Sequence, residues 1–167
     1  VNTGRNFPSD QGERIVLPYL RQLGLKDLDG ILLTDFYKKH SGGLRAVMRD
    51  VSVKKVVLPE AGPVPADLES LMRRCRQKIA FAKSGELWDA GDEALTILET
   101  RKQGIALLME ADPQSVLFVS HINLLTIGLL EQADPEAVIL PFLKGPLPQN
   151  AMDVMAKYKG KWVIAGA

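Results

Sequence analysis

Apolar and polar positions follow two alternating periods along the chain, which predicts a succession of helices and strands. Near the start, apolar residues between Ile15 and Leu23 recur at roughly helical spacing. They follow Asp10-Gln11-Gly12-Glu13, which has the spacing of an N-cap with a reciprocal glutamate. We expect this helix to stop at Gly24 and to bend at Pro18, or to have its first turns there.

The same pattern continues to the other end of the chain. Further helices are predicted for residues 43–49, 66–76, 123–131 and 150–157. Strands are predicted for residues 31–34, 54–58, 78–83, 94–99, 104–111, 115–119, 137–140 and 162–165. The order is helix–strand pairs, then an antiparallel meander, then helix–strand pairs. This order predicts an α/β fold of mixed sheets with outer helices in layers.

Composition narrows the class of protein. The chain has 167 residues, of which 46% are hydrophobic and 25% charged, as in an ordinary globular domain, and we expect one domain over residues 1–167. The net charge of +1 provides no global field for nucleic acid or membrane. Cys75 is the single cysteine, so an intrachain disulfide is excluded. Residues 116–130 are too short and too polar to span a bilayer. The chain starts without Met, and we expect it to be a fragment of a longer protein.

A polar loop follows the apolar strand residues Ile31, Leu32 and Leu33 and ends in His40-Ser41-Gly42-Gly43. This layout resembles the metal-binding loop of the metallo-β-lactamase fold, whose pattern is Thr-His-x-His/Asp-x-Asp-His-x-Gly-Gly. The strand and the glycine pair are present, whereas most of the metal ligands are replaced.

Five segments together resemble the metallo-β-lactamase-like domain of the ComEC family, the DNA-internalisation competence proteins. They are Val1–Gly4, Gly12–Arg21, Leu28–Thr34 with the loop that follows it, Ser115–His121 and Val138–Phe142. The resemblance implies a partial metallo-β-lactamase-like αββα sandwich. It also implies a parent integral membrane protein of bacteria that passes single-stranded DNA across the cell membrane during transformation. The domain would lie on the extracytoplasmic side, and its partners would be single-stranded DNA and transmembrane channel segments of the same parent.

The resemblance also identifies the positions of the former metal ligands: Asp35, Tyr37, Lys39, His40, His121 and Phe142. Of these, only His40 matches the family pattern. Tyr37 and Phe142 offer no ordinary zinc ligand, and a charged Lys39 would repel a dication. Unit charges 4 Å apart interact by ~4 kcal/mol at an effective dielectric constant near 20, and a dication roughly doubles this energy. The chain has only two histidines, whereas a dinuclear zinc hydrolase needs several imidazoles and a bridging carboxylate.

The individual residues leave alternatives open. His40 is a structural histidine under the glycine turn, or a remaining ligand of a weak zinc or manganese site with Asp35 and His121. His121 follows a predicted strand and precedes a predicted helix. It is a capping or buried polar residue, or it lies at the carboxyl end of the sheet, where such folds commonly bind ligands. Lys38, Lys39 and Lys144 are solvated loop lysines or phosphate contacts for DNA.

Other motifs add little. The basic run Arg73, Arg74, Arg76 and Lys78 is a helix end or a nucleic-acid contact, with no interleaved aromatic residue for stacking. The chain has no Gly-x-Ser-x-Gly, no Gly-x-Gly-x-x-Gly and no P-loop.

Two functional hypotheses lead. The first is a non-catalytic domain of a competence protein, with no catalytic residue and no cofactor, which keeps a structural, docking or DNA-guiding role. The alternative is an active metal-dependent hydrolase or nuclease that uses a residual metal site, or one completed by other segments. A generic α/β interaction domain unrelated to DNA is a third hypothesis.

Overall fold

The computed structural model describes residues 3–5, 7–59, 66–74, 79–89, 91–101, 104–141 and 145–164. The chain divides into two compact units, an N-terminal unit (Val1–Ala82) and a C-terminal unit (Lys83–Ala167). The prediction of one domain over residues 1–167 stays a prediction. No helix in the described ranges is long and apolar enough to cross a bilayer.

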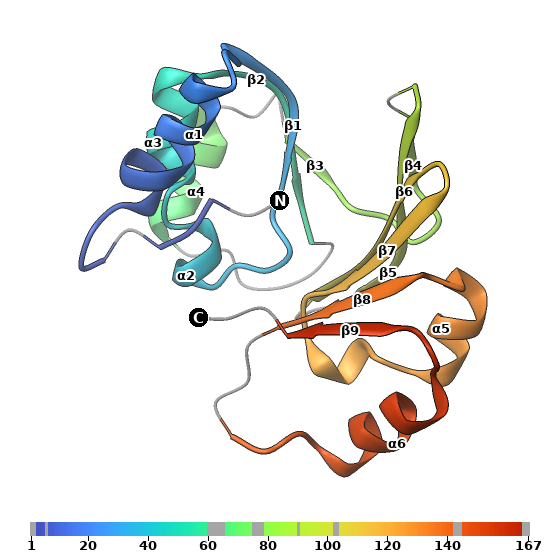
Figure 1. Cartoon of the computed structure of the whole chain (residues 1–167). Helices are drawn as coiled ribbons and strands as arrows, with labels where there is room; N and C mark the ends of the chain where they lie inside the picture. Colours follow the sequence, from blue (N-terminus) through green and yellow to red (C-terminus); the bar gives the residue numbers. More distant parts are fainter. Residues whose placement is uncertain are drawn as a thin grey trace. The chain divides into compact units, whose positions relative to one another are not determined.

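The N-terminal unit is a parallel three-stranded sheet with helices on one face (Figure 1). Its strands, in the order β1-β2-β3, are Asp27–Leu32, Ser52–Leu58 and Ile79–Phe81. Its helices are η1 (Gly12–Val16), α1 (Leu17–Gln22), α2 (Lys38–Ser41), α3 (Leu44–Asp50) and α4 (Ala66–Arg74). Apolar residues of η1, α1, α3 and α4 pack with Ile31, Val53, Val56 and Leu58 in one core cluster.

The first helix begins with a turn of π-helix, η1, and becomes an α-helix at Leu17. The Leu17 N–H bonds to the Gly12 carbonyl, five residues back. Pro18, in the first turn of α1, has no N–H to continue the ladder. The change from π-helix to α-helix therefore occurs beside Pro18, where the sequence predicted either a bend or the first turns of the helix.

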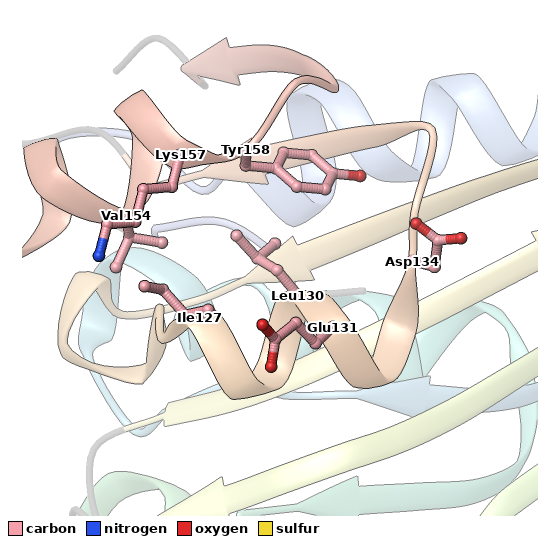
Figure 2. A pocket seen from close by; sticks show the side chains of 7 residues that line it. All are labelled: Ile127, Leu130, Glu131, Asp134, Val154, Lys157 and Tyr158. Carbon is pink, nitrogen blue, oxygen red and sulfur yellow. The ribbon is translucent and has the colours of Figure 1, made fainter.

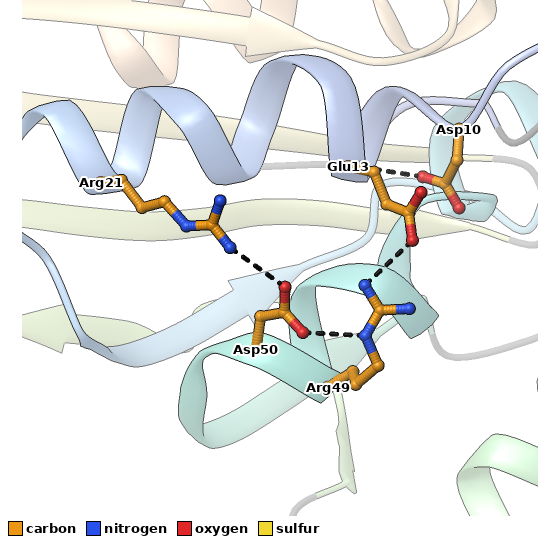
Figure 3. A network of polar contacts seen from close by, with 5 residues as sticks. All are labelled: Asp10, Glu13, Arg21, Arg49 and Asp50. Carbon is orange, nitrogen blue, oxygen red and sulfur yellow. Dashed lines mark hydrogen bonds and ion pairs between the residues drawn. The ribbon is translucent and has the colours of Figure 1, made fainter.

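An ion-pair network joins this helix to α3 (Figure 3). Asp10 Oδ1 accepts from the Glu13 N–H at 3.2 Å, as expected of the N-cap. Instead of bonding back, the Glu13 carboxylate accepts from Arg49 Nη2 at 2.9 Å. Asp50 accepts from Arg49 Nε at 2.8 Å and from Arg21 Nη2 at 3.3 Å. Hydrogen bonds to Asp50 and Glu13 raise the pKa of Arg49, and the bond to Arg49 lowers the pKa of Asp50.

The C-terminal unit is a mixed six-stranded sheet, in the order β4 to β9, with helices packed on one face. Its antiparallel strands are β4 (Leu87–Asp89), β5 (Glu93–Arg101), β6 (Gly104–Ala111) and β7 (Gln114–Val119). β8 (Ala137–Leu140) and β9 (Lys161–Ile164) add in parallel. Its helices are η3 (Ile122–Leu124), α5 (Ile127–Ala133) and α6 (Gln149–Lys157).

Several predicted boundaries were wrong, for local reasons. The strand predicted at residues 31–34 starts at Asp27, because its exposed first half pairs with β2 without an apolar signal. Four residues of the loop after it form helix α2. The helix predicted at residues 123–131 is interrupted, because the Thr126 side chain accepts from the Leu129 N–H at 3.1 Å and starts α5 there.

Candidate functional site

The loop after β1 rests on the first described residues of the chain. The Thr3 N–H donates to the His40 carbonyl at 2.8 Å, and the Gly43 N–H donates to the Gly4 carbonyl at 2.9 Å. Gly12 and Gly43 lie in close contact here. A Cβ on Gly43 would lie 2.2 Å from the Thr3 carbonyl oxygen, and one on Gly12 would lie 2.4 Å from the Gly43 carbonyl oxygen. Both positions therefore require glycine.

A side-chain pair holds the loop from within. His40 Nδ1 lies 2.6 Å from Asp35 Oδ2, and Asp35 Oδ1 accepts from the Tyr37 N–H at 2.8 Å. The Asp35 side chain is 5% exposed and the His40 side chain 25%. An ionised carboxylate only accepts, so Nδ1 donates and Nε2 is the remaining ring nitrogen. Both carboxylate oxygens of Asp35 are thus used in ordering the loop.

The other two loop positions face solvent. Tyr37 is 52% exposed, and Lys39 Nζ lies 5.8 Å from the centroid of its ring. This is a cation–π contact at the outer limit of the usual range. Lys38 is also exposed and begins α2. The exposed side of the loop therefore presents an aromatic ring and lysines.

These residues do not fit the metal centre that the loop pattern implies. Asp35 is bonded within the protein, Tyr37 carries a phenol, and Lys39 carries a cation. His40 Nε2 is the one imidazole nitrogen of the loop outside the bond to Asp35, whereas catalytic zinc sites use three protein ligands. Within the described ranges, no group of three or more His, Cys, Asp or Glu side chains could hold a metal ion. The donor set of the loop is therefore too small for the catalytic centre of the family pattern.

His121 belongs to the C-terminal unit, where it caps a turn. It follows β7, and its Nδ1 accepts from the Asn123 N–H at 3.3 Å at the start of η3. With Nδ1 accepting, the neutral ring carries its hydrogen on Nε2. The neighbouring Ser120 Oγ accepts from the Ile105 N–H at 2.8 Å. A histidine in this bonding state offers no free lone pair to a metal.

The remaining predicted residues divide into two groups. Phe142 and Lys144, and also Arg76 and Lys78 of the basic run, lie outside the described residues. Arg73 and Arg74 are exposed in the last turn of α4, with Arg73 3.6 Å from Glu69 across one helical turn. This placement is typical of basic side chains at a helix C-terminus.

Sequence reasoning missed the Asp35–His40 pair. It left His40 as a structural histidine under the glycine turn or as a metal ligand with Asp35 and His121, whereas the structure bonds Asp35 and His40 to each other. A usable signal was present: a carboxylate and an imidazole five residues apart, around the start of a short helix. Such a pair can close the loop by itself.

A separate cavity of about 260 Å³ lies in the C-terminal unit (Figure 2). Apolar and charged side chains of α5 and α6, and of the residue that follows each helix, line it: Ile127, Leu130, Glu131, Asp134, Val154, Lys157 and Tyr158. Burial, with a contribution from Asp134, raises the pKa of Tyr158. None of the predicted site residues that the structure describes lines this cavity.

Comparison of the sequence with known proteins finds one curated protein that is similar to part of the chain. No protein-family model matches the chain. The chain is 25% identical over 97 residues to ComE operon protein 3 of Bacillus subtilis (strain 168), a match that spans 56% of this chain and 12% of that protein.

Solved structures share the architecture. The metallo-β-lactamase fold protein YhfI of Bacillus subtilis has a TM-score of 0.58 and 12% identity, covering 98% of this chain and 82% of that one. The metallo-β-lactamase SMB-1, bound to 2-mercaptoethanesulfonate, has a TM-score of 0.58 and 18% identity. The match covers 83% of this chain and 66% of that one. The chain has the α/β metallo-β-lactamase fold, and the resemblance found in the sequence is confirmed.

Proposed function

We propose that this chain is part of a competence protein of DNA uptake, in which a metallo-β-lactamase fold is kept without hydrolysis. The observation that carries the proposal is the Asp35–His40 pair. It binds two former ligand positions to each other, and so it orders the loop by protein contacts where relatives would use metal ions.

Two further observations support this proposal. The match to ComE operon protein 3 covers more than half of the chain at 25% identity. Because the match spans only 12% of that protein, its whole activity and its membrane segments enter here as part of the proposal. The parent would be an integral membrane protein, with this domain on the extracytoplasmic side beside the channel segments.

The exposed side of the loop suits single-stranded DNA. Tyr37 offers a ring on which a base can stack, and Lys38 and Lys39 offer cations for the phosphates beside it. Lys144 is proposed as a further phosphate contact. With a net charge of +1, contact would be local and weak, as expected of a domain that guides a strand without holding it.

The first experiment is elemental analysis for zinc and manganese on the purified protein, with wild type beside His40→Ala. We expect far less than one ion per chain in both proteins. About one ion or more in wild type, lost in His40→Ala, would contradict the non-catalytic proposal and direct the work to nuclease assays with that metal.

The second experiment measures binding of single-stranded DNA over a range of salt concentrations. Lys39→Ala should weaken binding and reduce the salt slope by about one phosphate contact, and Tyr37→Ala should weaken binding with little change in that slope. Lys157→Ala removes an exposed lysine from α6 and is the matched control. Equal affinities for all four proteins would refute the DNA contact at this loop.

The alternative function is an active metal-dependent hydrolase or nuclease. It is favoured by His40, which keeps one ring nitrogen outside the Asp35 pair, and by the fold shared with SMB-1. Its metal would need Asp35 and His121 to leave their present bonds, or ligands from other segments. Metal-dependent cleavage of DNA that is lost in His40→Ala would establish it.

A further inference from the structure

The first helix, which runs from η1 through α1, carries both buried and exposed apolar side chains. Leu17 and Leu20 are buried in the core of the N-terminal unit. Ile15, Tyr19 and Leu23 are 59%, 59% and 53% exposed. They are four residues apart, so they form one line along the helix, which we call the α1 stripe. A surface helix normally places polar residues on its exposed face, and no described part of the N-terminal unit covers the stripe.

Cations flank the α1 stripe. The segment from Arg14 to Lys26 contains Arg14, Arg21 and Lys26 and no acidic residue. All three side chains are exposed. Of the acids beside the helix, Asp50 pairs with Arg21 and Arg49, and Glu13 pairs with Arg49 (Figure 3), whereas Asp27 follows Lys26 and is exposed. An apolar line with cations beside it is the pattern of a helix that lies on a membrane surface.

We propose that the α1 stripe docks on an anionic lipid bilayer surface. Ile15 and Leu23 would enter the boundary between headgroups and acyl chains, where Tyr19 can bury its ring and keep its hydroxyl in the polar layer. Arg14 and Lys26 would meet the lipid phosphates. Leu25, 43% exposed in the turn after α1, extends the apolar surface.

A second copy of the chain suits this surface less well. Three exposed side chains provide much less than the roughly 800 Å² per partner of a stable interface.

Docking of the α1 stripe on lipid goes beyond the proposed function, because it depends on neither DNA binding nor a metal. Its test is co-sedimentation of the full chain with vesicles of phosphatidylcholine containing roughly 30% phosphatidylglycerol, beside vesicles of phosphatidylcholine alone. We expect binding to the anionic vesicles that falls as salt is added, and much weaker binding to the neutral ones.

Three variants define the surface. The triple variant Ile15→Gln, Tyr19→Gln, Leu23→Gln should lose about ten-fold or more in partition coefficient, because each side chain gives up apolar burial. Met152→Gln removes an exposed apolar side chain from α6 and should bind as wild type does. The double variant Arg14→Glu, Lys26→Glu leaves the stripe intact and should lose binding to the anionic vesicles alone.

Two outcomes would overturn the proposal. One is equal partition of wild type and the triple variant on anionic vesicles, with both proteins shown to be folded by circular dichroism. The other is a wild-type dimer in sedimentation that the triple variant abolishes, since the stripe would then belong to a contact between copies. Loss of binding in the double variant would support the proposal even if the triple variant did not fold.

Discussion

The two histidines of the chain occupy comparable places in different units, and their bonds differ. His40 follows β1 and is bonded to a buried carboxylate, in a loop that rests on Thr3 and Gly4. His121 follows β7 and caps a single turn of 3₁₀-helix with a 3.3 Å bond. The family resemblance predicts a ligand position for both, yet one is part of a connected network and the other serves one local turn. Position in a family pattern therefore predicts where a side chain lies better than what it binds.

The largest effect should come from the backbone contact beneath His40. Gly43→Ala places a Cβ 2.2 Å from the Thr3 carbonyl oxygen, so the start of α3 must move. We expect a loss of about 3 kcal/mol in the free energy of unfolding, measured by chemical denaturation. Gly128→Ala is the matched control, because its Cβ would meet nothing within 4 Å and alanine favours the helix by about 0.5–1 kcal/mol. Equal values for the two variants would show that the close contact is not rigid.

Removing the buried carboxylate should have the next largest effect. Asp35→Ala leaves the Tyr37 N–H and His40 Nδ1 without their acceptor, at a cost of about 2 kcal/mol. Asp35→Asn keeps an oxygen for the Tyr37 N–H and should cost less. The comparison uses the free energy of unfolding from denaturant titration. A fully stable Asp35→Ala protein would mean that the pair does not order the loop.

Replacing His40 should lower the free energy of unfolding more than replacing His121. His40→Ala leaves the buried Asp35 carboxylate short of one donor and should cost about 1–2 kcal/mol. His121→Ala removes one weak cap and should cost about 0.5–1 kcal/mol, and His121→Asn should recover most of that loss. Thermal unfolding of both variants in parallel provides the test. A larger loss at His121 would reverse the order of the two histidines.

The smallest effect concerns added metal. Zinc should raise the melting temperature by less than about 1 °C, because a ligand stabilises only when its concentration exceeds its dissociation constant for the folded chain. The measurement is thermal unfolding with and without zinc for wild type, His40→Ala and His121→Ala. A rise of several degrees that either variant loses would show that its histidine serves as a ligand.

The sequence predicted the regular parts of the fold and missed the local exceptions. The apolar alternation of residues 94–99 and 104–111 located β5 and β6, since each strand repeats one period over several residues. The π-helical turn of η1, the short α2 and the break before α5 each depend on one or two hydrogen bonds, made by the Leu17 N–H, the Ser41 N–H and hydroxyl, and the Thr126 hydroxyl. Single bonds leave no periodic trace in a sequence.

The bonding within the candidate site was not predicted. The loop pattern named Asp35, Tyr37, Lys39 and His40 as site positions, and in the structure they lie on the segment that follows β1 and forms α2. It could not show that Asp35 turns inward to His40 while Tyr37 turns outward, because that choice depends on burial and on the Tyr37 N–H. The roles of these residues in function stay a prediction.

The contact between Gly12 and Gly43 makes the loop an attractive scaffold for protein engineering. Its backbone is held by glycine packing and by bonds to Thr3 and Gly4, none of which uses the side chains that face solvent. Ligand residues could therefore be installed at positions 37 and 39 without redesigning the path of the chain. Asp35 would have to be changed last, because its carboxylate accepts the two bonds that order the loop from within.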